Sequence, residues 1–170
     1  MKLLSLAGAD RETREVLLLA LIRELTGAEL RVSAAVRMSD GFEVDRPGKD
    51  SYEHRQAGAR EVVLASGERW ALMGDCSDDR GPREPELLNR LADADLVIAE
   101  GFDDEPIPCL YLIDSTAESS HGPAPKGPVL AHVGRNASVP AAGPPTFALD
   151  DIKSIATFII ERYSLSARPT

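Results

Sequence analysis

Cysteines and long apolar runs are both scarce in this chain of 170 residues. Its two cysteines, Cys76 and Cys109, form no C-x-x-C pair, and neither has a histidine at ligand spacing, so the pattern predicts no zinc site. No apolar run is long enough to span a bilayer, and residues 1–7 are too short for the apolar part of a secretory signal. These absences predict a cytoplasmic protein with free thiols.

Positive charge is scarce as well, because 19 Lys and Arg stand against 28 Asp and Glu and give a net charge of -9. Nucleic acids and anionic membranes attract proteins through an excess of Lys and Arg, so neither is predicted as a partner. Basic residues do gather in the middle of the chain, which leaves open a small anion site or simply a solvated surface. They are Arg46, Lys49, Arg55 and Arg60.

The apolar pattern predicts an α/β fold in a single domain over residues 1–170. The fully apolar run 96–99 is typical of a parallel sheet covered on both faces, so we expect a mostly parallel sheet with helices on both sides and a β-hairpin extension. Gly27 should end the first helix, which we expect to be buried, and polar loops should fill 74–85 and 115–128. Strands are expected at 2–7, 31–37, 61–65, 69–73, 96–99, 110–113 and 129–133, and helices at 12–26, at 86–94 and after 150–151.

An incomplete phosphate loop joins the first expected strand to the first helix. An intact loop reads G-x-x-x-x-G-K-[ST], whereas residues 8–15 read GADRETRE. Gly8 keeps the first glycine, but Thr13, Arg14 and Glu15 replace the second glycine, the lysine and the hydroxyl residue. Arg14 keeps a positive charge that can bind phosphate, while Glu15 would repel a phosphate about 4 Å away by about 4 kcal/mol at an effective dielectric near 20. A magnesium ion between Glu15 and the phosphate would turn this repulsion into attraction and make Glu15 a metal ligand. Otherwise the segment is only a connection.

Further segments accompany this loop and give the chain a specific resemblance. They read VDRPGKDSYEHRQAGA at 44–59, EVVLAS at 61–66, RWALM at 69–73, DLVIAEGF at 95–102 and EPIP at 105–108. With them the chain resembles the MobB family, the molybdopterin-guanine dinucleotide biosynthesis adaptor proteins. The resemblance implies a P-loop-NTPase-like three-layer sandwich, binding of GTP and Mg²⁺, a homodimer, and help to the guanylyltransferase that attaches GMP to molybdopterin.

The resemblance also implies site residues. Glu100 stands in the E-G-F segment at the end of a buried strand, where it would hold magnesium or water, or else cap Gly101 and the nearby backbone. The nucleotide and metal candidates are therefore Gly8, Thr13, Arg14, Glu15 and Glu100, with Glu15 and Glu100 as the metal ligands. The polar block in mid-chain implies a surface for a cofactor, an anion or a partner, formed by Asp45, Lys49, Asp50, His54, Arg55 and Gln56.

The resemblance implies two alternative functions. One is a GTP-binding adaptor of molybdenum cofactor biosynthesis. The other is a nucleotide-free interaction protein or chaperone that binds a molybdoenzyme or a molybdopterin-type cofactor. The departures from the family pattern remove a loop glycine and the hydroxyl ligand of the metal, and they place Cys109 where the family usually has a lysine, while the mid-chain block is retained. This asymmetry argues against GTP hydrolysis, and we assign no catalytic residue.

Overall fold

The computed structural model describes residues 2–37, 46–59, 61–74, 91, 93–113, 124–135 and 143–167. The chain divides into two compact units, one made of residues 1–37 and 91–170 and the other of residues 38–90. Each unit has its own sheet. The expectation of a single domain stays a prediction.

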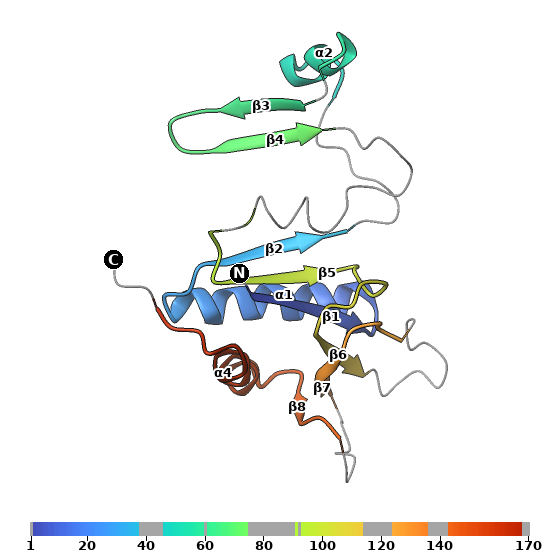
Figure 1. Ribbon diagram of the computed structural model, residues 1–170, viewed down its shortest axis with the longest axis vertical. Helices are drawn as coiled ribbons and strands as arrows, with labels where there is room; N and C mark the ends of the chain where they lie inside the picture. Colours follow the sequence, from blue (N-terminus) through green and yellow to red (C-terminus); the bar gives the residue numbers. More distant parts are fainter. Residues whose placement is uncertain are drawn as a thin grey trace. The chain divides into compact units, whose positions relative to one another are not determined.

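The larger unit is built on a six-stranded sheet whose paired strands all run parallel (Figure 1). This arrangement confirms the α/β class and the parallel sheet. Thr146–Ala148 was not expected as a strand, because three residues after a pair of prolines carry no periodic signal. The spatial order is β2 (Val32–Val36), β5 (Leu96–Glu100), β1 (Lys2–Gly8), β6 (Cys109–Ile113), β7 (Val129–Gly134) and β8 (Thr146–Ala148).

Two helices cover one face of this sheet, α1 (Arg11–Gly27) and α4 (Ile152–Tyr163). Alternate residues of the strands, such as Leu4 and Leu6 of β1, belong to the same buried cluster as four leucines of α1 and the buried isoleucines of α4. The hydroxyl of Tyr163 at the end of α4 donates a hydrogen bond of 2.7 Å to the Leu3 carbonyl. The core therefore fixes the ends of β1 and β5, where the candidate loop residues lie.

Helix α1 differs from its prediction in two details. Gly27 is its last helical residue, and the chain leaves the helix at Ala28. The helix was expected to be buried, and it is buried on one side only, because Val16 is 61% exposed and Leu19 is 45% exposed. Leu17, Leu18, Leu21 and Leu25 form the buried face, at the spacing that a helix with one covered side requires.

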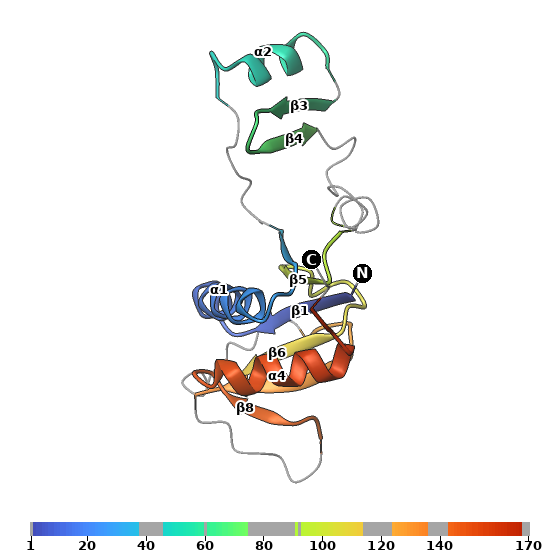
Figure 2. The ribbon, with the colours of Figure 1, turned by 90° about the vertical axis from the view of Figure 1, so that its left-hand side faces the viewer.

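The smaller unit contains the predicted hairpin and a helix that was not predicted (Figure 2). Strands β3 (Glu61–Ala65) and β4 (Trp70–Gly74) pair antiparallel. Ser66 closes the turn, because its backbone N–H and its hydroxyl donate to the Arg69 carbonyl and its hydroxyl accepts the Arg69 N–H. Helix α2 (Asp50–Gln56) is short and almost wholly polar, so it has too few apolar residues for a periodic signal.

Several expectations fall on parts of the chain that the structure does not describe. These are most of the helix 86–94 and of the loops 74–85 and 115–128, together with Asp45, Arg60 and Cys76. Where the described ranges reach the expected helix, residues 91 and 93 form turns and residue 94 has no regular structure. None of the helices in the described ranges is long and apolar enough to cross a membrane.

Candidate functional site

The segment after β1 turns sharply between the sheet and α1. Gly8 has φ +78° and Ala9 has φ +35°. Glycine adopts positive φ without steric cost, whereas alanine does so rarely. A Cβ at Gly8 would run into the carbonyl of Leu112 on β6, so the close approach of these two strands also requires glycine. The Ala9 N–H donates to the same Leu112 carbonyl at 3.1 Å. The first glycine of the loop thus has a structural reason to be present.

Asp10 caps the start of α1. Its carboxylate accepts the backbone N–H of Thr13 at 2.7 Å and the Thr13 hydroxyl at 3.0 Å. The backbone bond from Thr13 is the main reason that the pKa of Asp10 is lowered, and the Thr13 hydroxyl and the backbone N–H of Glu12 also contribute. A negative charge therefore already binds the Thr13 N–H, one of the groups that the start of a helix offers to an anion.

Arg14 lies against the loop and against the end of β5. Its Nε donates to Oε1 of Glu100 at 3.2 Å, and its Nη1 donates to the carbonyls of Gly8 at 2.7 Å and Ala9 at 2.8 Å. Only 17% of the Arg14 side chain and 4% of the Glu100 side chain are exposed. The structure thus brings together three predicted site residues, Gly8, Arg14 and Glu100, and Arg14 bonds to both of the others.

Glu15, the other predicted metal ligand, is exposed on α1. Glu100 is committed to Arg14, and no group of three or more His, Cys, Asp or Glu suited to a metal occurs among the residues that the structure describes. A magnesium nucleotide would need loop N–H groups and a cation turned toward its phosphates. Here the Asp10 carboxylate accepts the Thr13 N–H at the start of α1, and the Arg14 charge is compensated by Glu100, so this arrangement does not fit the nucleotide and metal that the resemblance implies.

The mid-chain candidates lie in the smaller unit, on and beside α2. Lys49, Asp50, His54 and Gln56 are exposed, whereas Arg55 is half-buried and the neighbouring Ser51 is buried. Gly48 and Gly58 flank the helix with φ +86° and φ +104°, a backbone conformation that favours glycine in tight turns. Asp45 lies outside the described residues. Donors and acceptors of both charges are thus displayed on one short helix.

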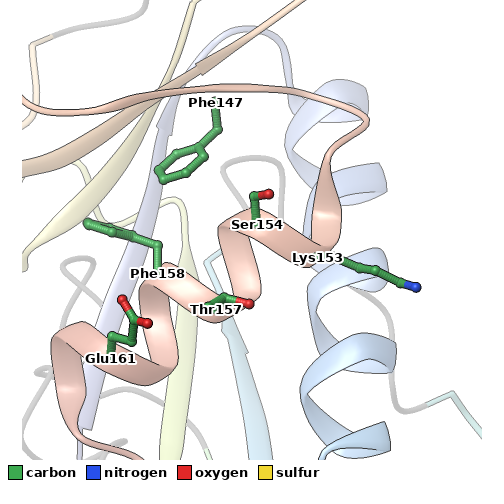
Figure 3. A pocket seen from close by; sticks show the side chains of 6 residues that line it. All are labelled: Phe147, Lys153, Ser154, Thr157, Phe158 and Glu161. Atoms are coloured by element: carbon green, nitrogen blue, oxygen red, sulfur yellow. The ribbon is translucent and has the colours of Figure 1, made fainter.

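A hollow on the larger unit involves none of the predicted residues. Figure 3 shows it between β8 and α4, where the rings of Phe147 and Phe158 lie 5.3 Å apart. Its other lining residues are Lys153, Ser154, Thr157 and Glu161. The hollow is open and holds no convergent set of polar groups, so we assign it no function.

Two residues with defined roles were missed from the sequence. Asp10 is a preferred cap residue three positions before Thr13, a signal that could have been recognised. Arg37, after β2, stacks its guanidinium 4.1 Å from the ring of Phe102 and donates to Asp104 at 2.6 Å. No local pattern predicts that contact, because the two segments are distant in the chain.

Comparisons with known proteins agree with the fold and with the sequence pattern. The model of the MobB family, described as molybdopterin guanine dinucleotide synthesis protein B, matches residues 3–133. The chain is 33% identical over 164 residues to the molybdopterin-guanine dinucleotide biosynthesis adapter protein of Escherichia coli, a match over 94% of this chain and 91% of that protein. It is 37% identical over 116 residues to the protein of the same name from Haemophilus influenzae, where the match covers 65% of this chain and 62% of the relative, less than two thirds of its length.

Solved structures give the same result. A crystal structure of molybdopterin-guanine biosynthesis protein B (mobB) superimposes with a TM-score of 0.76 at 26% identity, over 96% of this chain and 99% of that one. The crystal structure of Bacillus subtilis MobB has a TM-score of 0.71 at 17% identity, over 95% and 98% of the two chains, and this second likeness supports the fold alone.

Proposed function

This chain belongs to the molybdopterin guanine dinucleotide synthesis protein B (MobB) family, and from that membership we propose that it is an adapter in molybdopterin guanine dinucleotide biosynthesis. The observation that carries the proposal is the extent of the match, which covers 94% of this chain and 91% of an adapter protein with that name. An adapter acts by binding, which agrees with a chain to which we assign no catalytic residue.

We propose a molybdopterin guanylyltransferase or a molybdoenzyme as the partner. The contact surface is α2 with the residue before it, where Lys49, His54 and Gln56 are exposed. Exposed polar residues of mixed charge give orientation and specificity more than raw affinity, which suits transient delivery between proteins. A molybdopterin-type cofactor, which carries phosphate, would find cationic donors at Lys49 and Arg55.

A homodimer is the second part of the proposal. The smaller unit has a two-stranded sheet, and a hairpin alone is marginally stable in water. Val63 is 63% exposed and Trp70 is 68% exposed on this hairpin, so apolar surface is available to a second copy.

Binding to a purified guanylyltransferase tests the adapter function. The triple variant Lys49→Ala, His54→Ala, Gln56→Ala should weaken the complex by about tenfold or more in titration calorimetry, since central polar contacts of an interface commonly cost that much. Arg69→Ala is the matched control, because this exposed arginine lies in the hairpin turn of the same unit. Equal affinity of the triple variant and the native chain would contradict α2 as the surface, and no complex with the native chain would contradict this partner.

The alternative is a nucleotide-free interaction protein or chaperone of a molybdoenzyme. The observation that favours it is the pairing of Arg14 with Glu100, which uses the charge that would otherwise meet a nucleotide. Binding to an apo-molybdoenzyme in the absence of the guanylyltransferase would support the chaperone over the biosynthetic adapter. Binding only to the guanylyltransferase would exclude it.

A further inference from the structure

The loop between β1 and α1 is filled by side chains of its own chain. We infer that the Asp10 carboxylate and the Arg14 guanidinium occupy the positions that a phosphate group and the lysine that binds it would take in an intact loop. This chain therefore acts without binding a nucleoside triphosphate. The inference depends on the contacts of the larger unit alone, so it does not depend on which partner binds to the surface at α2.

The anion position is taken by Asp10. A phosphate binds at the start of a helix because backbone N–H groups point toward it and the helix dipole favours negative charge. The Asp10 carboxylate accepts the Thr13 N–H at 2.7 Å and the Thr13 hydroxyl at 3.0 Å. A phosphate would have to displace this carboxylate or lie beside it at like charge.

The cation position is taken by Arg14 in a form that a phosphate cannot readily use. Its Nε–H is directed at Glu100, whose side chain is only 4% exposed, and Nη1 is directed at the two loop carbonyls. Turning the guanidinium toward a phosphate would leave a buried carboxylate without its cation.

The loop backbone itself presents acceptors at this point. The carbonyls of Gly8 and Ala9 point at the Arg14 guanidinium, 2.7 Å and 2.8 Å from Nη1. A phosphate loop works by turning N–H groups inward. Carbonyl oxygens in the same place would face phosphate oxygens with negative charge, so binding would need both a new Arg14 conformation and a new loop conformation.

These contacts give the loop a structural purpose. Arg14 of α1 joins the end of β1, through Gly8, to the end of β5, through Glu100. The proposed contact surface at α2 is then available to a partner at all times, because no nucleotide binds at the loop to switch it.

Titration calorimetry and thermal unfolding of the full chain test the inference with GTP and ATP, each with and without Mg²⁺. No heat and no increase in Tm are expected with nucleotide at about a hundredfold excess over a micromolar Kd, an excess at which a true ligand stabilises measurably. A micromolar Kd for either nucleotide would overturn the inference, while leaving the adapter function intact.

A loop-restoring variant tests the cause. Asp10→Ser, Thr13→Gly, Arg14→Lys and Glu15→Thr together remove the two internal ligands and supply the residues of an intact loop. We expect GTP affinity to rise by at least a hundredfold over the native chain. A folded variant whose GTP affinity does not rise would contradict the inference that these side chains prevent nucleotide binding.

A second measurement needs no substitution that could unfold the chain. The Nε–H of Arg14, held by Glu100, should give a protected signal in the ¹⁵N-correlated NMR spectrum of the native chain. That signal should not shift when GTP and Mg²⁺ are added. A shift in this signal on addition would show that the guanidinium leaves Glu100 for the nucleotide, and the inference would fail.

Discussion

The guanidinium of Arg14 and the carboxylate of Glu100 form an ion pair of 3.2 Å between residues separated by 86 positions in the chain. Both side chains are largely removed from water, and the arginine is further bonded to two backbone carbonyls. A pair that is desolvated and additionally hydrogen-bonded stabilises a fold mainly by making either single charge costly to leave behind. It joins the beginning of α1 to the end of β5.

The first prediction is that the losses of stability from removing the two members of this pair are not additive. Arg14→Met and Glu100→Leu should each lower the free energy of unfolding by about 3–5 kcal/mol, because each leaves a buried charge unpaired. The double variant should lose less than the sum of the two, and chemical denaturation of all four proteins measures the coupling.

Arg31→Ala is the matched control for that experiment. Arg31 also forms an ion pair, with Asp95 at 3.6 Å, but its side chain is 48% exposed. Its loss should cost about 0–1 kcal/mol, as for other solvated pairs. Additive losses at Arg14 and Glu100, or a loss at Arg31 of the same size, would contradict the special role of the buried pair.

The second prediction concerns acid stability. The pKa of Asp10 is lowered in the folded chain, chiefly by the Thr13 N–H, so the folded state prefers the carboxylate more than the unfolded state does. The resulting stability is present above the unfolded pKa near 3.8 and is lost as pH falls through the lower folded value. Asn is also a good cap, so Asp10→Asn keeps the cap and removes only the titration.

The measurement is the Tm of the native chain and of Asp10→Asn between about pH 6 and pH 2. The difference in Tm between the native chain and Asp10→Asn should become smaller as the pH falls. Glu15→Gln, on the exposed side of the same helix, serves as control and should follow the native curve. A gap that is constant with pH would argue against the charge of Asp10 as the stabilising feature.

The third prediction separates two glycines. Gly8→Ala should destabilise the chain by about 1–3 kcal/mol or more, because φ is +78° and the new Cβ would meet the Leu112 carbonyl. Gly27→Ala at the end of α1 should be neutral or stabilising by up to about 1 kcal/mol, since nothing lies within 4 Å and alanine favours helix. Urea denaturation of the two variants decides the matter, and similar values for both would refute the close approach of β1 and β6.

Much of the fold was predictable because its signals are local. The apolar strand 96–99 indicated a buried parallel sheet, and the turn at Ser66 between two β-rich segments indicated the hairpin. The short strand β8 and the polar helix α2 were missed, since three residues cannot show a period and α2 buries only Ser51. Their formation depends on neighbours that are distant in the chain.

The site was predictable as a set of residues and not as a set of contacts. The substitutions at Thr13, Arg14 and Glu15 indicated a changed loop from the sequence alone. That Arg14 turns back onto the Gly8 and Ala9 carbonyls and meets Glu100 depends on the register of β1 and β5, a non-local property.

The fourth prediction concerns Cys109 on β6, whose side chain is buried. Burial, and then the charge of Asp103, raises the pKa of its thiol from 9.0 to about 11. Because the thiolate is the reactive form, native Cys109 should resist thiol reagents at pH 8 and react only when urea unfolds the chain. Cys76→Ser isolates this thiol, and absorbance from released thionitrobenzoate follows the reaction.

The same shift gives an alkaline limit to stability. In the unfolded chain the thiol loses its proton near pH 9, before the folded one does near pH 11. The contribution of Cys109 is therefore fully present below about pH 9 and is lost as pH rises through the folded pKa. Cys109→Ala should flatten the fall of the unfolding free energy over this range. An equally steep fall in that variant, or rapid modification of the folded Cys76→Ser protein at pH 8, would mean that the thiol is accessible and ordinary.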